Sequence, residues 1–151
     1  MKYYLSMLLT LCCLLSSSAN ASQTCDAECQ LPQIHAYFKA LDKVSQSGSS
    51  EQDVDDFLGL LHPKVNYIHL EYGANFDRAS WRSAFIRNIA RGAYQQPKEQ
   101  RVLNYIVGKN HVAVEYAHGS IQPDGQWQQE QPLLVLFGFA DGKISLVKEL
   151  W

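Results

Sequence analysis

Three side chains in the sequence have the chemistry for proton transfer: His69, His118 and Glu149. A neutral imidazole can accept a proton near pH 7, and an imidazolium can donate one. The carboxylate could orient one of the rings and fix its tautomer. Such a set would support proton abstraction next to a carbonyl group, or a dehydration. The alternative is that each histidine is simply hydrogen-bonded at the polar mouth of a cavity.

The same residues are of types that can ligate a metal ion. Their spacing matches no local metal motif, and they fall on different predicted strands, so we expect neither a metal nor another cofactor. Tyr37 could donate a hydrogen bond to a developing oxyanion, or its ring could simply pack into the core. The sequence has no G-x-x-x-x-G-K phosphate loop and no serine nucleophile elbow.

A helix predicted from apolar periodicity should position Tyr37. A first amphipathic helix is predicted, with Pro32 in its first turn, from the recurrence of Leu31, Ile34, Tyr37, Phe38 and Leu41. Ser50 and Asp53 have the spacing of a capping box. They precede a short helix, ended by Pro63, whose apolar face is Val54, Phe57, Leu58 and Leu61. A third helix is predicted over residues 77–91, with Trp81, Phe85 and Ile89 on one face and Gly92 as its stop.

Strand patterns should position the two histidines and Glu149. Residues 65–72 predict a strand with Val65, Tyr67 and His69 on one side. Four further strands are predicted over residues 101–107, 111–121, 126–139 and 143–151, separated by glycine-containing turns. Three helices and one strand followed by an antiparallel meander indicate the α+β class, in which N-terminal helices pack on a curved, mainly antiparallel sheet.

The beginning of the chain has the layout of a secretory signal peptide. Lys2 precedes an apolar run from Tyr3 to Leu15, and the sequence Ala19-Asn20-Ala21 follows. The run is shorter than the roughly 20 residues of a membrane-spanning helix. We expect cleavage after Ala21 rather than an uncleaved anchor. The domain would then comprise residues 22–151 and be secreted or periplasmic, with no membrane attachment after cleavage.

Charge and cysteine content are compatible with export. The formal net charge is −2 and no cluster of Lys and Arg occurs, so nucleic acid is not an expected partner. Cys25 and Cys29 would remain after cleavage, and close thiols can pair in an oxidising compartment. Their C-x-x-x-C spacing is near the upper limit of Cα separation. We expect an intrachain disulfide, with a bridge to another chain or two free thiols as alternatives.

Several motifs resemble the nuclear transport factor 2-like superfamily, specifically its SnoaL-like and ketosteroid-isomerase-like members. These motifs are HAYFKALD (35–42), LLHPKV (60–65), FDR (76–78) with Trp81, and FGFADGKI (137–144). The resemblance covers essentially all of residues 22–151. It implies a cone in which a bent sheet wraps around helices, with a pocket at one end, and it implies a homodimer formed through the sheet. The superfamily contains isomerases, cyclases, dehydratases and non-catalytic binders, so the fold leaves the function open.

The ketosteroid-isomerase pattern is only partly present. Tyr37 lines up with a tyrosine of the oxyanion hole, His69 replaces the carboxylate base, and Val135 stands where the family has a protonated aspartate. That oxyanion hole needs both the tyrosine and the neutral acid. The resemblance therefore does not extend to ketosteroid isomerisation itself.

The resemblance also implies which strand faces line the pocket, because strand alternation alone does not identify the concave face. Four residues are candidates for catalysis: Tyr37, His69, His118 and Glu149. Six are candidates for ligand binding, although core packing is the main expectation for Trp81: Tyr67, Trp81, Tyr116, Val135, Phe137 and Trp151. Such a pocket would be mostly apolar and aromatic, as small-ligand sites are.

Two functions follow from this pocket. We expect an exported protein that binds a small apolar molecule without catalysis. The alternative is a cofactor-free acid–base isomerase, cyclase or dehydratase of a small carbonyl compound. In that enzyme His69 would be the base and Tyr37 the oxyanion donor, with His118 and Glu149 as the second acid or as orienting groups.

Overall fold

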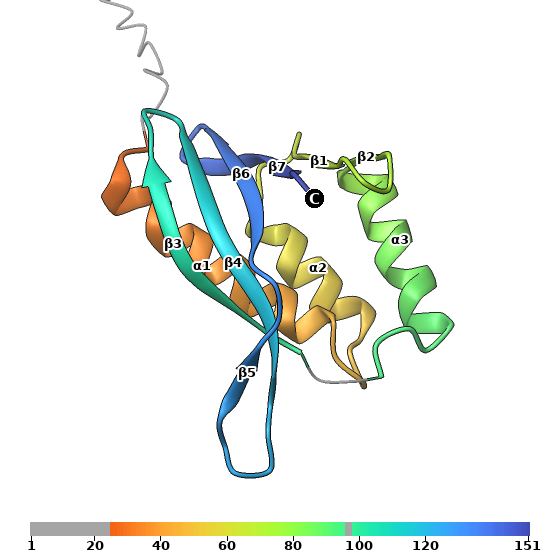
Figure 1. Ribbon diagram of the computed structural model, residues 1–151. Coiled ribbons are helices and arrows are strands. Elements are labelled where there is room, and N and C mark those ends of the chain that lie inside the picture. Colours follow the sequence, from red (N-terminus) through yellow and green to blue (C-terminus); the bar gives the residue numbers. More distant parts are fainter. Residues whose placement is uncertain (1–24, 96–97) are drawn as a thin grey trace, which may run out of the picture.

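The computed structural model describes residues 25–95 and 98–151 (Figure 1). The expected signal peptide, residues 1–21, lies outside this part of the chain. The elements follow in the order α1 (Ala27–Val44), α2 (Glu51–Gly59), β1 (Asn66–His69), β2 (Ala74–Asp77), α3 (Arg78–Ala90), β3 (Glu99–Val107), β4 (His111–Ile121), β5 (Trp127–Gln129), β6 (Leu133–Ala140) and β7 (Lys143–Glu149). None of the helices described is long and apolar enough to cross a bilayer.

Helix α1 starts earlier than its apolar periodicity predicts. Asp26 caps the helix, because its side chain accepts a hydrogen bond from the Cys29 amide at 3.2 Å. Pro32 therefore lies inside the helix rather than in its first turn, and that prediction is wrong. The predicted inner face is confirmed, since Ile34, Tyr37 and Phe38 are all buried.

The capping box predicted before α2 is confirmed. The Ser50 hydroxyl accepts from the Asp53 amide at 3.3 Å, and the Asp53 carboxylate accepts from the Ser50 amide at 2.9 Å. The ammonium of Lys43 also lies 2.5 Å from the Asp53 carboxylate, which joins the end of α1 to the start of α2. Val54, Phe57 and Leu58 are buried on the inner face of α2.

The strand predicted over residues 65–72 is shorter than expected and forms one arm of a hairpin. β1 pairs antiparallel with β2, and Gly73 in the turn has a φ of +59°, a conformation that favours glycine. Asp77 ends β2 and at once caps α3, accepting from the Ser80 amide at 2.8 Å. The hairpin therefore sets where α3 begins. The prediction that Trp81 and Phe85 share a buried face of this helix is confirmed.

The predicted meander is confirmed, with one correction. β3, β4, β6 and β7 pair antiparallel with their neighbours, and β7 pairs parallel with β1, giving the sheet order β2-β1-β7-β6-β4-β3. A single strand over residues 126–139 is wrong. The chain breaks around Pro132, which lacks the N–H that a ladder requires. The short strand β5 pairs with the end of β4 instead, and the two project from the body as a hairpin (Figure 1).

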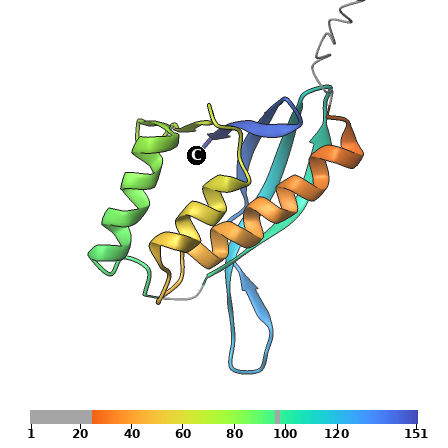
Figure 2. The same ribbon diagram turned by 180° about the vertical axis from the view of Figure 1, so that it is seen from behind.

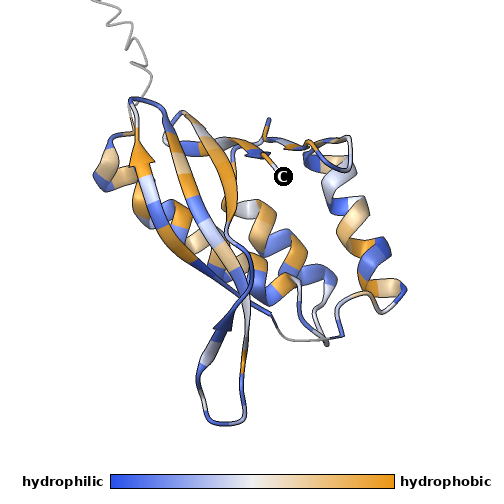
Figure 3. Ribbon diagram, in the orientation of Figure 1, coloured by the Kyte–Doolittle hydropathy of each residue, from blue (hydrophilic) through white to orange (hydrophobic). Residues whose placement is uncertain are grey.

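Within the described ranges the molecule has two layers, and the α+β class is confirmed. Helices α1 and α2 cover one face of the curved sheet, and α3 extends from the end of the β1–β2 hairpin alongside α2 (Figure 2). The strands bury alternate apolar residues toward the helices, while polar residues interrupt them (Figure 3). These inner-face residues are Val112, Val114, Tyr116, Val135, Phe137 and Val147.

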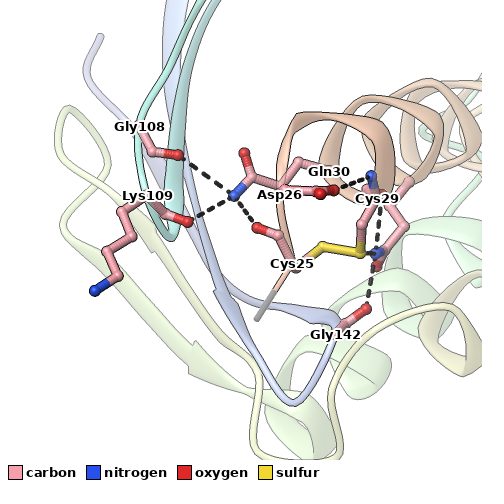
Figure 4. Close-up of a disulfide and its surroundings, with 8 residues drawn as sticks. Cys25, Asp26, Cys29, Gln30, Gly108, Lys109 and Gly142 are labelled. Atoms are coloured by element: carbon pink, nitrogen blue, oxygen red, sulfur yellow. Dashed lines mark hydrogen bonds between the residues drawn. A yellow bond between two sulfur atoms is a disulfide. The ribbon is translucent and has the colours of Figure 1, made fainter. Parts of the chain in front are cut away.

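The start of α1 is tied to two hairpin turns (Figure 4). The sulfur atoms of Cys25 and Cys29 are at disulfide distance, 2.05 Å apart, as expected for an intrachain bridge. The buried amide of Gln30 donates to the carbonyl of Lys109 at 3.1 Å, in the β3–β4 turn. The amide of Gln33 donates to the carbonyl of Gly142 at 2.7 Å, in the β6–β7 turn.

Candidate functional site

Glu149 is a buried carboxyl group at the end of β7. It lies beside His69 in the parallel β1–β7 pair, and the residue is 8% exposed. The Tyr67 hydroxyl donates to its Oε2 at 2.8 Å, and the Tyr116 hydroxyl donates to its Oε1 at 3.3 Å. Trp151 donates in turn to the Tyr116 oxygen at 3.1 Å. A chain of hydrogen bonds from two strand residues and the C-terminal Trp151 thus holds the carboxyl group in place.

Burial governs the protonation of this group. It raises the pKa of Glu149 above the ordinary carboxyl value, although the hydrogen bonds from Tyr67 and Tyr116 oppose the shift. Burial, followed by the charge of Glu149, also raises the pKa of Tyr67 and of Tyr116. Both hydroxyls therefore stay protonated and act as donors to the carboxylate.

His69 contacts Glu149 from the end of β1. Its Nε2 lies 3.3 Å from Oε2, but within the described residues it makes no hydrogen bond of good geometry. Its Nδ1 accepts from the Tyr72 amide at 3.4 Å, which assigns the ring proton of the neutral form to Nε2, facing the carboxyl group. Burial lowers the pKa of His69, with a smaller opposing effect from Glu71, and so favours the neutral ring.

Aromatic rings shield His69 from solvent. The Tyr72 ring stacks on the imidazole with centroids 4.2 Å apart, and the Trp151 ring meets it edge-on at 4.3 Å. His69 is only 2% exposed as a result. The Nε2 atom of the ring therefore contacts Glu149 rather than bulk water.

A cavity of about 210 Å³, here called the inner cavity, lies beside Glu149 between α1, the β1–β2 hairpin and α3. Its walls are mainly aromatic and aliphatic: Tyr37, Leu41, Tyr67, Phe76, Trp81, Ala84, Phe85, Asn88, Tyr94 and Glu149. The Tyr67 and Trp81 rings stack 4.5 Å apart and brace the wall. The half-buried Asn88 and Tyr94 form the rim, joined by a 3.0 Å hydrogen bond from the Asn88 amide to the tyrosine oxygen.

Tyr37 lines this cavity, and its hydroxyl is unused. The residue is 1% exposed, and its hydroxyl has no hydrogen-bond partner in residues 25–95 and 98–151. Burial, and then the charge of Glu149, raise the pKa of Tyr37 well above the usual phenol value. The hydroxyl is therefore a protonated donor without an acceptor, a state that costs free energy in a folded protein.

The structure brings part of the predicted site together. Tyr37, Tyr67, Trp81 and Glu149 all line the inner cavity. His69 touches Glu149 but is not one of the cavity-lining residues. The other ligand-binding candidates lie behind the wall: Tyr116 and Trp151 in the hydrogen-bond chain, and Val135 and Phe137 in the packed core.

His118 lies in a different pocket. It lines a larger depression of about 650 Å³ beside the loop that follows α3, together with Ser45, Tyr94 and Lys98. Burial and then the charge of Lys98 lower the pKa of His118, against a smaller effect of Glu130. The structure therefore does not join His118 to the His69–Glu149 pair. In the part of the chain that is described, no three His, Cys, Asp or Glu side chains cluster as metal ligands would.

Several wall residues were not singled out as site residues from the sequence. Asn88 follows Trp81 by seven residues, so helical periodicity places it on the same face of α3 and could have marked it. Phe76 and Tyr94 carry no such signal. Phe76 reaches the wall through the hairpin, and Tyr94 through the loop that follows Gly92. Strand pairing within the sheet brings Phe76 to Glu149, and the position of α3 brings Tyr94 there.

Comparison with known proteins identifies the fold. No family model and no curated protein matches the sequence. Among solved structures, a nuclear transport factor 2-like protein of unknown function from Exiguobacterium sp. is 16% identical, with a TM-score of 0.55 over 78% of this chain and 95% of the other. A protein assigned as a SnoaL-like polyketide cyclase from Jannaschia sp. is 18% identical, with a TM-score of 0.56 over 85% and 88%.

A third structure extends the likeness. It is a hypothetical protein with a ketosteroid isomerase-like fold from Catenulispora acidiphila, solved in complex with trimethylamine. It is 14% identical, with a TM-score of 0.55 over 79% of this chain and 84% of the other. At these identities the comparison speaks for the fold alone. The chain therefore has the nuclear transport factor 2-like cone fold, which SnoaL-like and ketosteroid-isomerase-like proteins share.

Proposed function

We propose that this protein binds a small, mostly apolar molecule in the inner cavity, with Glu149 as the main polar contact. The observation that carries the proposal is a cavity of about 210 Å³ in which one buried carboxyl group stands among aromatic walls. An apolar cavity of about 150 Å³ accepts benzene. The inner cavity therefore has room for a substituted six-membered ring.

The free hydroxyl of Tyr37 supports the same proposal. A buried donor without an acceptor costs on the order of 1–3 kcal/mol, and a bound molecule with an acceptor atom would remove that cost. Tyr37 and Glu149 line the same cavity, one offering a donor and the other an acceptor. A ligand with a single polar substituent could use either group while its apolar part contacts Trp81 and Phe85.

We further propose that binding takes place after export. The signal-like layout of residues 1–21 supports this location, as does the pair of cysteines at disulfide distance.

Filling the cavity tests the proposal. Benzyl alcohol should cause saturable NMR shifts at the Trp81 indole and the Phe85 amide. Ala84→Phe should abolish these shifts, because Ala84 lies on the cavity wall. Ala90→Phe is the matched control, since Ala90 is exposed at the end of the same helix. Binding that survives A84F, or no saturable shift in the unmodified protein, would refute the proposal.

A second candidate function is acid–base catalysis on a small carbonyl compound. It is favoured by the contact of 3.3 Å between Glu149 and a neutral His69. The Glu149 carboxylate would take the proton from the carbon next to the carbonyl, and Tyr37 would donate a hydrogen bond to the enolate oxygen. Return of the proton to a different carbon would complete an isomerisation. His69 would support the carboxylate by contact, with its Nε2 3.3 Å from Oε2.

Proton exchange tests this second candidate. If the protein catalyses proton transfer, the methyl NMR signal of acetophenone in D2O should disappear by deuterium exchange faster than in buffer alone. Glu149→Gln should return exchange to the buffer rate, whereas Asp124→Asn, in the exposed turn between β4 and β5, should leave it unchanged. Exchange in the unmodified protein at the buffer rate would remove the catalytic candidate and leave the binding function standing.

A further inference from the structure

We infer that the inner cavity recognises a small organic cation, a primary alkyl- or arylalkylammonium, through the carboxylate of Glu149 and the aromatic rings around it. The inference rests on the proposed binding function and names its class of ligand.

The charge of the cavity wall is the first argument. Among the described residues that line the cavity, Glu149 is the one carboxyl group, and none is Lys, Arg or His. A buried carboxylate without a counter-charge is unfavourable. His69, which touches Glu149 from outside the cavity, does not supply that charge, because burial favours its neutral form. A bound ammonium group would supply the missing positive charge.

The aromatic walls are the second argument. Six of the cavity-lining residues in the described part of the chain are aromatic: Tyr37, Tyr67, Phe76, Trp81, Phe85 and Tyr94. The negative faces of aromatic rings attract cations, most strongly where water is excluded. The Tyr67 hydroxyl touches Glu149 at 2.8 Å, and its ring stacks on Trp81. A cation placed at the carboxylate would therefore also lie close to these rings.

The hydrogen-bonding groups are the third argument. A carboxylate oxygen has two acceptor positions, and each oxygen of Glu149 receives one hydroxyl, from Tyr67 or from Tyr116. Further acceptor capacity is therefore left for a ligand. The amide nitrogen of Asn88 is turned to Tyr94, so its carbonyl oxygen is available as an acceptor at the rim. An ammonium group, with three donors and no acceptor, suits this set better than an anion does.

Protonation then couples to binding. The titratable groups that face Glu149 are Tyr67 and His69 from β1, Tyr116 from β4 and Tyr37 from α1. Burial raises the pKa of the three tyrosines and lowers the pKa of His69, so each of the four favours its neutral form and the carboxylate is the charge that the cation meets. Binding should release the proton of Glu149, and affinity for a cation should rise with pH until this group is fully ionised.

Ligands of nearly the same shape but different charge test the inference. The probes are benzylammonium, neutral benzyl alcohol and anionic benzoate, titrated into the purified protein by NMR or calorimetry. Benzylammonium should bind at least about tenfold more tightly than benzyl alcohol, and benzoate should bind most weakly. Glu149→Gln should reduce the preference for the cation to within about threefold, whereas Asp124→Asn, in the exposed turn between β4 and β5, should preserve it.

The possible outcomes separate the inference from the proposed function. If benzyl alcohol binds as tightly as benzylammonium, or if benzoate binds best, the cavity is a binding site but the cation inference fails. If none of the three probes binds, both fail. The comparison of probes in the unmodified protein does not depend on any variant. If E149Q proves unfolded, the rise of benzylammonium affinity with pH provides the second readout, and an affinity independent of pH would overturn the inference.

Discussion

At the scale of residues, the burial of Glu149 is unusual for a glutamate. Carboxylates are usually exposed, but this one lies inside, held by the hydroxyls of Tyr67 and Tyr116 and touched by His69. The sequence marked His69 as the base and Glu149 as its orienting group. The geometry places Glu149 on the cavity and His69 behind it, which makes Glu149 the group that would meet a ligand.

The raised pKa of Glu149 gives stability a defined pH dependence. The folded state holds this proton at pH values where the unfolded chain has already lost it. The free energy of unfolding should therefore fall as pH rises from the ordinary carboxyl pKa through the raised pKa of Glu149. Glu149→Gln should remove this fall. At pH values above the raised pKa of Glu149, the variant should therefore have gained free energy of unfolding relative to the unmodified protein. Urea unfolding at a series of pH values measures the difference.

The control for this experiment is Asp124→Asn, which removes the same charge from an exposed position in the turn between β4 and β5. It should follow the unmodified protein at every pH. If the curves for E149Q and the unmodified protein run parallel, the carboxyl group of Glu149 ionises normally and the account of its burial is wrong.

At the scale of elements, a few polar side chains decide where helices and strands begin. Asp26, Ser50 and Asp77 accept hydrogen bonds from the first turns of α1, α2 and α3. Asp77 is also the last residue of β2, so it determines where the hairpin ends and α3 begins. Because Trp81, Phe85 and Asn88 lie on α3, this single cap contributes to placing one wall of the inner cavity.

Removal of this cap should destabilise the fold. Asp77→Ala leaves the Ser80 amide without its 2.8 Å acceptor and should lower the free energy of unfolding by about 1 kcal/mol. Ser83→Ala, at an exposed position on the same helix, should cost much less. Chemical denaturation measures both. Equal losses in the two variants would mean that the cap contributes nothing specific.

At the scale of the whole molecule, the outer face of the sheet is a second apolar surface. An outer groove of about 330 Å³ is lined largely by apolar residues, including Tyr105, Ile106, Ala113 and Leu134. Ile106 is 75% exposed and Leu134 is 43% exposed. Glu115 is the one charged residue lining the groove in the described part of the chain. A surface with so little charge fits another apolar surface, and two copies of this face can meet about a twofold axis.

We therefore propose a homodimer formed through the outer face. Ile106→Lys should shift the protein toward monomer, because it places a charge in the middle of the apolar contact. Ile121→Lys is the control, since Ile121 is equally apolar but lies on the projecting β4–β5 hairpin. Sedimentation velocity over a range of concentrations reports the change. A monomeric unmodified protein, or an equal effect of both substitutions, would contradict the proposal.

The sequence by itself determined the class of the fold and much of its local structure. Periodicity identified the buried faces of α1 and α3, the spacing of Ser50 and Asp53 marked a cap, and the spacing of Cys25 and Cys29 marked a pair. Such signals succeed because they concern residues that share one element or one turn.

Only the tertiary structure decided which side chains meet. It joined Glu149 to His69 through the parallel pairing of β7 with β1, and it brought Tyr94 to the inner cavity from a loop. It also left His118 in another pocket, although strand alternation placed it on the same side as Tyr116. The physical reason is that a cavity forms where faces of different elements converge. Strand register, sheet curvature and helix placement determine where the faces converge. The residue pattern within a single element does not specify any of these three.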